Sequence, residues 1–352
     1  MFAYWLMYFL PPLVFASVQA ADAKYNDRAW QALCVLFVFL IGLRFEVGGD
    51  WGSYLNHFES IVGTSLVETL SEYDPGYALL EWLFATLGWG IYGVNIACGA
   101  LVMTGVYQFC RQQSQPWLAL TVAVPYLIVV VAMGYTRQSA ALGLELIALV
   151  ALANGHLVRY ATWILLALTF HKTAVVLLPL ALVATSYENV WTKRILLAAT
   201  FLAMALLGGW ATFTDESQKL VTNYIEAEMI SEGANIRVAM NALPAAIFLV
   251  FAKRLAPDEV ERRTWVLLSL LSLACIPLLE VASTATDRIA LYLIPIQLFV
   301  YSRIGAAFNS DSSRLLANRV IVVGYAIVLF VLLNYATMVS VYWVPYQNAA
   351  FQ

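Results

Sequence analysis

Charged residues are scarce in this sequence of 352 residues, where Asp, Glu, Lys and Arg together make up 12%. Hydrophobic residues make up 62% and the mean hydropathy is +0.77, which is far from the composition of soluble domains. The chain has a formal net charge of -3 and no long basic run. This excludes nucleic-acid binding, which needs clustered Lys and Arg to neutralise phosphates. The sequence therefore predicts an integral membrane protein whose partner is the lipid bilayer, with one transmembrane domain over residues 1–352.

Cysteine and the familiar catalytic motifs are also rare or missing. The four cysteines lie in apolar stretches without C-x-x-C spacing, so they are expected to be buried thiols rather than disulfides or metal ligands. The sequence has no H-E-x-x-H motif, nucleophile elbow, triad spacing or D-x-D pair. Metalloprotease, serine hydrolase and metal-nucleotide glycosyltransferase activities therefore gain no support. We expect no metal and no other cofactor.

The apolar runs predict an all-α, polytopic transmembrane helical bundle with about ten full spans. The expected spans are 2–20, 29–43, 91–110, 117–134, 138–154, 195–212, 238–253, 264–282, 288–304 and 319–343. Two further apolar segments, 76–90 and 160–184, do not fit as simple crossings, so we expect them to be re-entrant or hairpin elements. Such elements occur only where they are buried in protein or line a wet cavity. They therefore predict a cavity on one face.

Positive charge predicts the orientation, because Lys and Arg gather in cytoplasmic loops. Most of the cations fall on one predicted side, while the other side has two acid-rich loops at about 44–75 and 213–236. We therefore place these loops and both termini outside the cytoplasm. A few cations nevertheless adjoin span ends on this outer side: Arg44, Arg137, Lys172, Arg237 and Arg288.

Helix capping or snorkelling would explain any one of these cations alone. Five of them on one face instead indicate an anion-binding surface. A diphosphate or a carboxylated sugar is the natural ligand, because guanidinium groups bind phosphate through two hydrogen bonds.

The segment after Arg44 contains further candidate site residues. Trp51 and Tyr54 are suited to stacking on sugar rings, or to an aromatic belt at the membrane surface. Asp50 follows two glycines and is either a proton acceptor or a helix N-cap.

The next polar segment precedes a predicted helix. Asp74 and Pro75 are explained as the N-cap and first turn of that helix. Glu72 and Tyr77, on either side of them, remain as candidate substrate-binding residues.

His171 and Lys172 interrupt a long apolar segment, which is costly in a membrane unless the side chains face water or a partner. His171 is either a hydrogen-bonded core residue or a group that removes a proton from a sugar hydroxyl. The neighbouring Lys172 would lower the pKa of His171 and keep it neutral. Further along, Arg288 and Tyr292 lie one turn apart and so share a helix face.

Taken together, these short motifs resemble the EpsG family, which belongs to the wider Wzy-like polysaccharide polymerases. The resemblance extends over most of the chain. The residues that carry it are Gly42, Arg44, Gly49, Asp50, Tyr54, the segment 72–77, Arg137, Gln138, the segment 170–174, Asp287, Arg288 and Tyr292.

The resemblance implies a GT-C-like helical bundle in the bacterial inner membrane, with its active site facing the periplasm. It implies a glycosyltransferase that joins undecaprenyl diphosphate-linked oligosaccharides, both donor and acceptor, without a metal. It also suggests a chain-length regulator and a flippase of the same pathway as partners. The expected catalytic residues are Asp50, Arg137, His171 and Arg288, and the expected substrate-binding residues are Arg44, Trp51, Tyr54, Glu72, Tyr77, Gln138, Lys172, Arg237 and Tyr292.

In this scheme the arginines hold the donor diphosphate, and either Asp50 or His171 removes the proton from the acceptor. Two other functional classes remain open. One is a polysaccharide O-acyltransferase or O-antigen ligase, and the other is a transporter or flippase for the lipid-linked saccharide. Transporters often have internal repeats, and no repeat between the two halves is visible here.

Overall fold

The computed structural model describes residues 1–18, 23–72, 74–183, 194 and 233–352. Within these ranges the regular structure is helical, apart from one isolated β-bridge between Arg44 and Asn348. This confirms the predicted all-α class for the described part of the chain.

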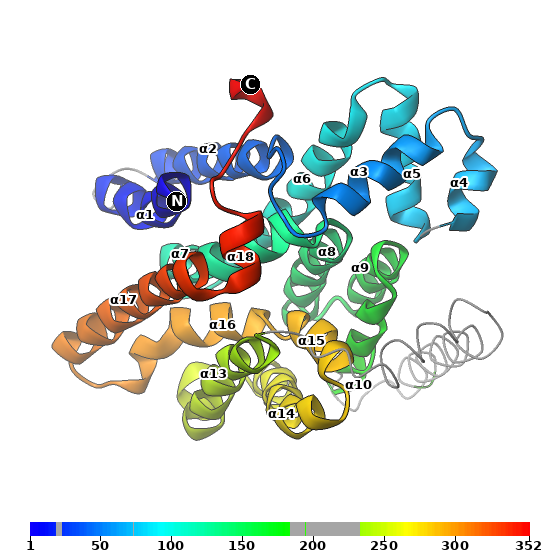
Figure 1. Cartoon of the computed structure of the whole chain (residues 1–352). Helices are drawn as coiled ribbons and strands as arrows, with labels where there is room; N and C mark the ends of the chain where they lie inside the picture. The colour runs from blue at the N-terminus through cyan, green and yellow to red at the C-terminus, as the bar shows by residue number, and fades with distance from the viewer. Residues whose placement is uncertain (19–22, 73, 184–193, 195–232) are drawn as a thin grey trace.

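The described helices differ widely in length. Those before residue 184, including the π-helix η1 and the 3-10 helix η2, are α1 (Phe2–Val18), α2 (Ala23–Gly42), α3 (Trp51–Ile61), α4 (Leu66–Glu72), α5 (Pro75–Thr86), α6 (Gly90–Arg111), α7 (Pro116–Ala123), η1 (Val124–Ala132), α8 (Thr136–Ala153), α9 (Leu157–Phe170), η2 (Lys172–Leu177) and α10 (Leu180–Val183). Those after residue 232 are α13 (Ala234–Leu255), α14 (Glu259–Val281), α15 (Ser283–Leu291), α16 (Pro295–Arg303), η4 (Ile304–Ala307), α17 (Asp311–Tyr335), α18 (Thr337–Tyr342) and η5 (Ala349–Phe351). In Figure 1, α8 runs through the middle of the molecule.

Five of the described helices are long and apolar enough to cross a membrane, namely α6, α8, α13, α14 and α17. The pair formed by α15 and α16 is bent by 51° and gives a sixth candidate if it counts as one span. The predicted span at 195–212 lies outside the described residues. The molecule is thus a multi-pass membrane protein, while the count of ten crossings stays a prediction.

The two predicted outer loops differ from simple loops. The segment at about 44–75 contains two helices, α3 and α4, after a short irregular stretch. In the segment 213–236, residues 213–232 lie outside the described residues and α13 begins at Ala234.

The predicted hairpin element at 160–184 is a broken helix. Helix α9 ends at Phe170, and the backbone of the next residue, His171, is extended, with φ −159° and ψ 117°. The Tyr160 hydroxyl in α9 donates a hydrogen bond to the carbonyl of Leu177 at the end of η2. Tyr160 lies in the helix before the break and Leu177 lies after it. They can be hydrogen-bonded only if η2 folds back along α9, so the chain reverses direction at His171. The other predicted element, 76–90, is mostly the helix α5. Whether either element is re-entrant in a membrane stays a prediction.

The buried core is built around η1 and α8. Every residue of η1 is buried, and so are nearly all residues of α8. Helices α6 and α8 approach closely because both have a glycine at the contact, and a Cβ atom on Gly105 would lie 2.1 Å from the carbonyl oxygen of Gly143. In contrast, α17 is apolar and mostly exposed, as expected for a helix that contacts lipid.

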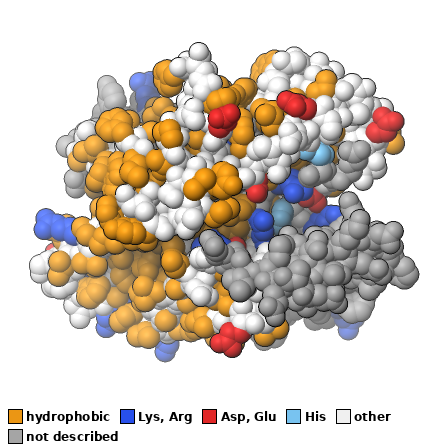
Figure 2. All heavy atoms as spheres, viewed as in Figure 1, with side chains coloured by type: hydrophobic (Ala, Val, Ile, Leu, Met, Phe, Trp, Pro, Cys, Tyr) orange, Lys and Arg blue, Asp and Glu red, His pale blue; other side chains and the backbone are white. Residues whose placement is uncertain are grey.

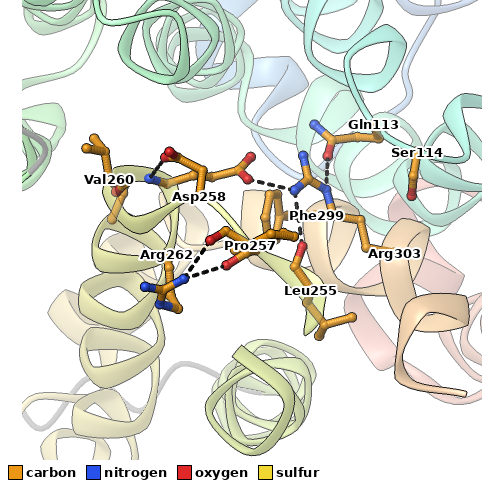
Figure 3. Close-up of polar contacts among 12 residues, drawn as sticks. Gln113, Ser114, Leu255, Pro257, Asp258, Val260, Arg262, Phe299 and Arg303 are labelled. Atoms are coloured by element: carbon orange, nitrogen blue, oxygen red, sulfur yellow. Dashed lines mark hydrogen bonds and ion pairs between the residues drawn. The ribbon is translucent and has the colours of Figure 1, made fainter. Parts of the chain in front are cut away.

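Arg303 at the end of α16 joins three elements at one end of the bundle (Figure 3). Its guanidinium donates hydrogen bonds to the Gln113 side chain (3.2 Å), the Leu255 carbonyl (3.2 Å) and the Glu261 carboxylate (2.9 Å). It also lies 4.0 Å from the Phe299 ring centroid. We call these residues the Arg303 latch, which ties α16 to the turn after α6 and the turn between α13 and α14.

The C-terminal segment clamps the loop between α2 and α3. Backbone hydrogen bonds run from Phe45 N to Gln347 O (3.0 Å), from Gly48 N to Tyr342 O (2.9 Å) and from Ala349 N to Leu43 O (2.8 Å). We call this set of contacts the C-terminal clamp. It fixes the loop that leads to Asp50.

Candidate functional site

Several helix ends meet at the opposite end of the bundle from the Arg303 latch. They are the starts of α3, α5 and α8, the break after α9, and α15. Gly48 allows the α2–α3 loop to approach this point, because its φ of +107° favours glycine and a Cβ atom there would lie 2.3 Å from the Met133 carbonyl oxygen. Basic, acidic and histidine side chains gather in this region of the surface in Figure 2.

Arg137 and Lys172 share one carboxylate, that of Asp74. Arg137 Nη1 lies 3.2 Å from Asp74 Oδ2, and Lys172 Nζ lies 4.0 Å from Asp74 Oδ1. Asp74 occupies the N-cap position of α5, but its side chain makes no capping hydrogen bond. The capping role that the sequence suggested for the Asp74 side chain is therefore wrong. Burial raises the pKa of Asp74, and Arg137 and Lys172 oppose that shift.

Arg288 has a different environment, with no carboxylate within ion-pair distance among the described residues. Its Nη1 donates to Gln138 Oε1 at 3.3 Å, and Gln138 Nε2 donates back to the Arg288 carbonyl at 2.9 Å. The guanidinium carbon lies 5.0 Å from the Tyr135 ring centroid. Arg288 is thus a positioned and partly exposed cation whose charge is available to an anion.

His171 lies beside the same cations. Its Nδ1 is 3.2 Å from the hydroxyl of Tyr292, which is fully buried. Burial is the largest cause that lowers the pKa of His171, to about 3, and the positive charges of Arg288, Arg137 and Lys172 lower it further. The ring is therefore neutral at physiological pH.

Asp50 stands at the start of α3, and its side chain makes no capping hydrogen bond. Among the described residues, none forms a hydrogen bond or ion pair with its carboxylate. Burial raises the pKa of Asp50, while Arg288 and Arg137 partly offset this effect. A half-buried carboxylate beside two arginines, with no partner of its own, is suited to accept a proton.

The EpsG family model matches residues 28–348 of the chain. The chain belongs to the EpsG family. This is a Wzy-like family of polysaccharide polymerases. No curated protein and no solved structure matches the chain.

Arg237 forms the other cationic part of the site in this EpsG family member. It comes from α13, and its Nε and Nη2 atoms contact the two carboxylate oxygens of Asp287 at 2.5 and 2.8 Å. Asp287 precedes Arg288 on α15, so the pair holds α13 against the helix that presents Arg288.

Arg44 is placed differently from the other predicted cations, because it is only 1% exposed. Its guanidinium donates to the carbonyls of Ile41 and Val47 and to the side chains of Asn95 and Thr136. It therefore joins the end of α2 to α6 and to the start of α8, next to Arg137.

Three of the predicted aromatic residues form an inner wall behind these cations. Trp51 is buried, with its ring 5.7 Å from the guanidinium carbon of Arg44. The Arg137 guanidinium carbon lies 5.9 Å from the Tyr54 ring, and that ring lies 5.7 Å from Tyr77, which is fully buried. Glu72 ends α4, and its side chain lies outside what the structure describes.

The structure therefore brings Asp50, Arg137, Gln138, His171, Lys172 and Arg288 together. The sequence did not identify Asp74 as a member, because a residue before Pro75 is sufficiently explained as a cap. Among the described residues, no group of three or more His, Cys, Asp or Glu side chains is placed to hold a metal ion. The arrangement can bind an anion and accept a proton at neighbouring points.

Proposed function

We propose that this EpsG family protein polymerises undecaprenyl diphosphate-linked oligosaccharide repeat units into an exopolysaccharide or O-antigen-like chain. The reaction is a metal-independent glycosyl transfer at the periplasmic face of the bacterial inner membrane. The observation that carries the proposal is Arg288, a positioned cation without a carboxylate partner among the described residues, next to Arg137 and the two possible proton acceptors.

The expected architecture has about ten crossings and two re-entrant elements in a GT-C-like bundle. The five long apolar helices among the described residues support the multi-pass part of this architecture. A flippase and a chain-length regulator of the same pathway remain the expected partners.

In the proposed reaction, the acceptor hydroxyl oxygen attacks the anomeric carbon of the donor sugar. The bond from that carbon to the phosphate oxygen breaks, and the diphosphate leaves with the bonding electrons. Arg288 and Arg137 offset the charge that develops on the leaving group. A single displacement of this kind inverts the anomeric configuration.

Asp50 is the better candidate for the base that takes the hydroxyl proton. Burial raises its pKa, and so increases its affinity for a proton, whereas the His171 pKa of about 3 makes that ring a weak proton acceptor. His171 instead has the hydroxyl of Tyr292 as its neighbour. We assign His171 and Tyr292 to hydrogen bonding with the substrate.

Asp74 and Arg44 are assigned as positioning residues. Asp74 holds Arg137 and Lys172 at a fixed separation, so that neither cation moves to form an ion pair with Asp50. Arg44 fixes Thr136 and hence the first turn of α8. Tyr54 and Tyr77 support the Arg137 side chain, and Gln138 supports Arg288.

The deciding experiment uses the purified protein in nanodiscs with an undecaprenyl diphosphate-linked repeat unit and a metal chelator. A ladder of products with released undecaprenyl diphosphate would support a metal-independent polymerase. A single addition without a ladder would indicate a ligase. An intact donor, with protein shown to be folded, would contradict the proposal and favour the transporter or O-acyltransferase alternatives.

A further inference from the structure

A groove of about 500 Å³ lies between the ends of α6 and α8 and the start of α9. It lies at the far end of these helices from the candidate site, because α8 begins at Thr136 and α9 ends just before His171. Its described lining residues include no Asp or Glu. The polar rim consists of Gln108, Asn154, His156, Arg159 and Thr162, and the apolar floor and wall consist of Ile147, Val150, Ala151 and Trp163.

Arg159 differs from arginines that line other cavities. Arg237 and Arg303 each line a cavity and each contact a carboxylate, that of Asp287 or Glu261. Arg159 is exposed and makes no hydrogen bond or ion pair within the described part of the chain. The start of α9 adds a positive partial charge beside it, because the first N–H groups of a helix have no carbonyl partner in that helix. The rim of the groove therefore favours an anion.

The floor of the groove runs along α8, which is apolar enough to cross a membrane. Ile147 comes two turns before Asn154, so the floor extends about 10 Å from the rim towards the middle of the helix. On α9, the apolar side chains of Leu165 and Leu166 are 53% and 40% exposed. A ligand with an anionic head at the rim and an apolar tail along α8 would use both parts of the groove, whereas a soluble anion would use only the rim.

We propose that this groove binds an anionic phospholipid, with its phosphate at Arg159 and the start of α9 and one acyl chain along α8. Basic pockets between helices at a membrane surface recognise lipid head groups of this kind. Snorkelling explains an arginine at the end of a span, but it does not need a groove between three helices around that arginine. The groove is also separate from the candidate site, since it lies at the other end of α8 from Arg137 and Gln138.

The two walls of the groove lead to the candidate site. Helices α8 and α9 pack side by side (Figure 1). The first turn of α8 contains Arg137, and α9 ends just before His171. A phospholipid between the other ends of these helices would fix their spacing, and so the separation of Arg137 from His171. The bound lipid therefore raises the rate of polymerisation, a consequence that rests on the proposed function.

The test of binding is photo-crosslinking of the full-length protein in phosphatidylcholine nanodiscs, with a trace of phosphatidylglycerol that carries a diazirine in its acyl chain. The labelling that unlabelled phosphatidylglycerol displaces should map to the end of α8 and to α9. Phosphatidylethanolamine and inorganic phosphate should not displace it. Displaceable labels that map elsewhere, or equal competition by inorganic phosphate, would overturn the inference. Stronger competition by undecaprenyl phosphate would overturn the assignment to a phospholipid.

Substitutions of exposed arginines sharpen this test. Arg159→Ala should lower the displaceable labelling about fivefold, as expected for the loss of one cation near an anionic head group. Arg159→Lys keeps the charge and should retain most of the labelling. Arg28→Ala is the matched control, since Arg28 is also exposed and without a partner among the described residues, but does not line the groove. Equal labelling of wild type and Arg159→Ala would contradict the proposed site.

The effect on turnover is measured separately. In nanodiscs with about 30% phosphatidylglycerol, wild type and Arg28→Ala should polymerise severalfold faster than in phosphatidylcholine alone, whereas Arg159→Ala should respond weakly. Displaceable labelling of the groove without a ladder in either lipid would retain the phospholipid site and reject the polymerase. A ladder whose rate responds equally to phosphatidylglycerol in wild type and Arg159→Ala would retain the polymerase and reject the role of the groove.

Discussion

Two arginines on the bent pair of helices α15 and α16 have opposite environments. Arg303, at the end of α16, donates to a carboxylate, an amide oxygen and a carbonyl, and also stacks on a ring. Arg288, in the last turn of α15, is held by one glutamine and one tyrosine ring. The guanidinium is fully engaged by internal contacts at one end of the pair, whereas at the other end it has no ion-pair partner among the described residues.

The two environments predict different roles for the two arginines, one in the stability of the fold and the other in function. A partly buried cation with complete partners ties elements together, and its removal leaves the partner charge unpaired. A cation that is held in place but has no opposite charge as a partner can attract an anionic ligand. The Arg303 latch is therefore expected to matter for folding, and Arg288 for turnover.

The largest expected effect is that of Arg288→Ala. Polymerisation in nanodiscs should fall about 100-fold or more, as when a charge-stabilising group is removed from a transition state. The amount of folded protein, measured by size-exclusion chromatography, should not change because Arg288 pairs with no carboxylate among the described residues. Arg288→Lys keeps the charge and should recover part of the activity. Normal product length in Arg288→Ala would remove Arg288 from the proposed site.

Asp74→Asn should have the next largest effect, a loss of about 10-fold or more in the initial rate. The substitution keeps the shape of the side chain but removes the charge shared by Arg137 and Lys172. Asp311→Asn is a suitable control, because that carboxylate forms an exposed ion pair with Arg314 in the first turn of α17. Equal rates for wild type and Asp74→Asn would mean that Asp74 has no positioning role in the site and only precedes helix α5.

The pH dependence of the rate distinguishes the two candidate bases. If Asp50 is the base, the rate should fall about tenfold per pH unit below its pKa, which burial raises above the ordinary aspartate value. A base with the His171 pKa of about 3 would stay deprotonated and produce no fall above that pH. The measurement is the initial rate from pH 8 down to pH 4, with recovery on return to pH 8 as the control for unfolding. A flat profile would favour His171.

Arg303→Ala should have the smallest effect on catalysis. The specific activity of the folded fraction should remain within about twofold of wild type, whereas the melting temperature should fall by about 5 °C or more. Arg263→Ala is the matched control, since Arg263 forms an exposed pair with Glu259 near the same end of the bundle. An Arg303→Ala variant with the wild-type melting temperature and no activity would contradict the structural role assigned to Arg303.

The sequence was sufficient to predict the helical membrane class and the family, and it named most of the cations that the structure brings together as a candidate site. The charges of Arg137, Lys172 and Arg288 are costly in an apolar chain, so their position at span ends already indicated a shared purpose. The break in the helix at His171 was also visible, because two polar residues interrupt an apolar run.

Other features depend on contacts between distant segments and have no local signal. Arg44 looks like the other outer cations in sequence, but Asn95 and Thr136 bury it. The Arg237–Asp287 pair joins residues 50 positions apart. The π-helix η1 replaces the α-helix that its apolar composition alone would predict, because composition does not encode the hydrogen-bond register.

The C-terminal clamp also has a consequence for biosynthesis. The loop that carries Gly48 is synthesised long before Tyr342 and Gln347, which supply its hydrogen-bond partners. Until they arrive, the loop lacks the backbone partners that hold it against η1 and α8. A nascent chain with only its first helices made would therefore contain Asp50 and Arg137 without the contacts that align them, and the candidate site would be complete only after α17 and α18 had been synthesised.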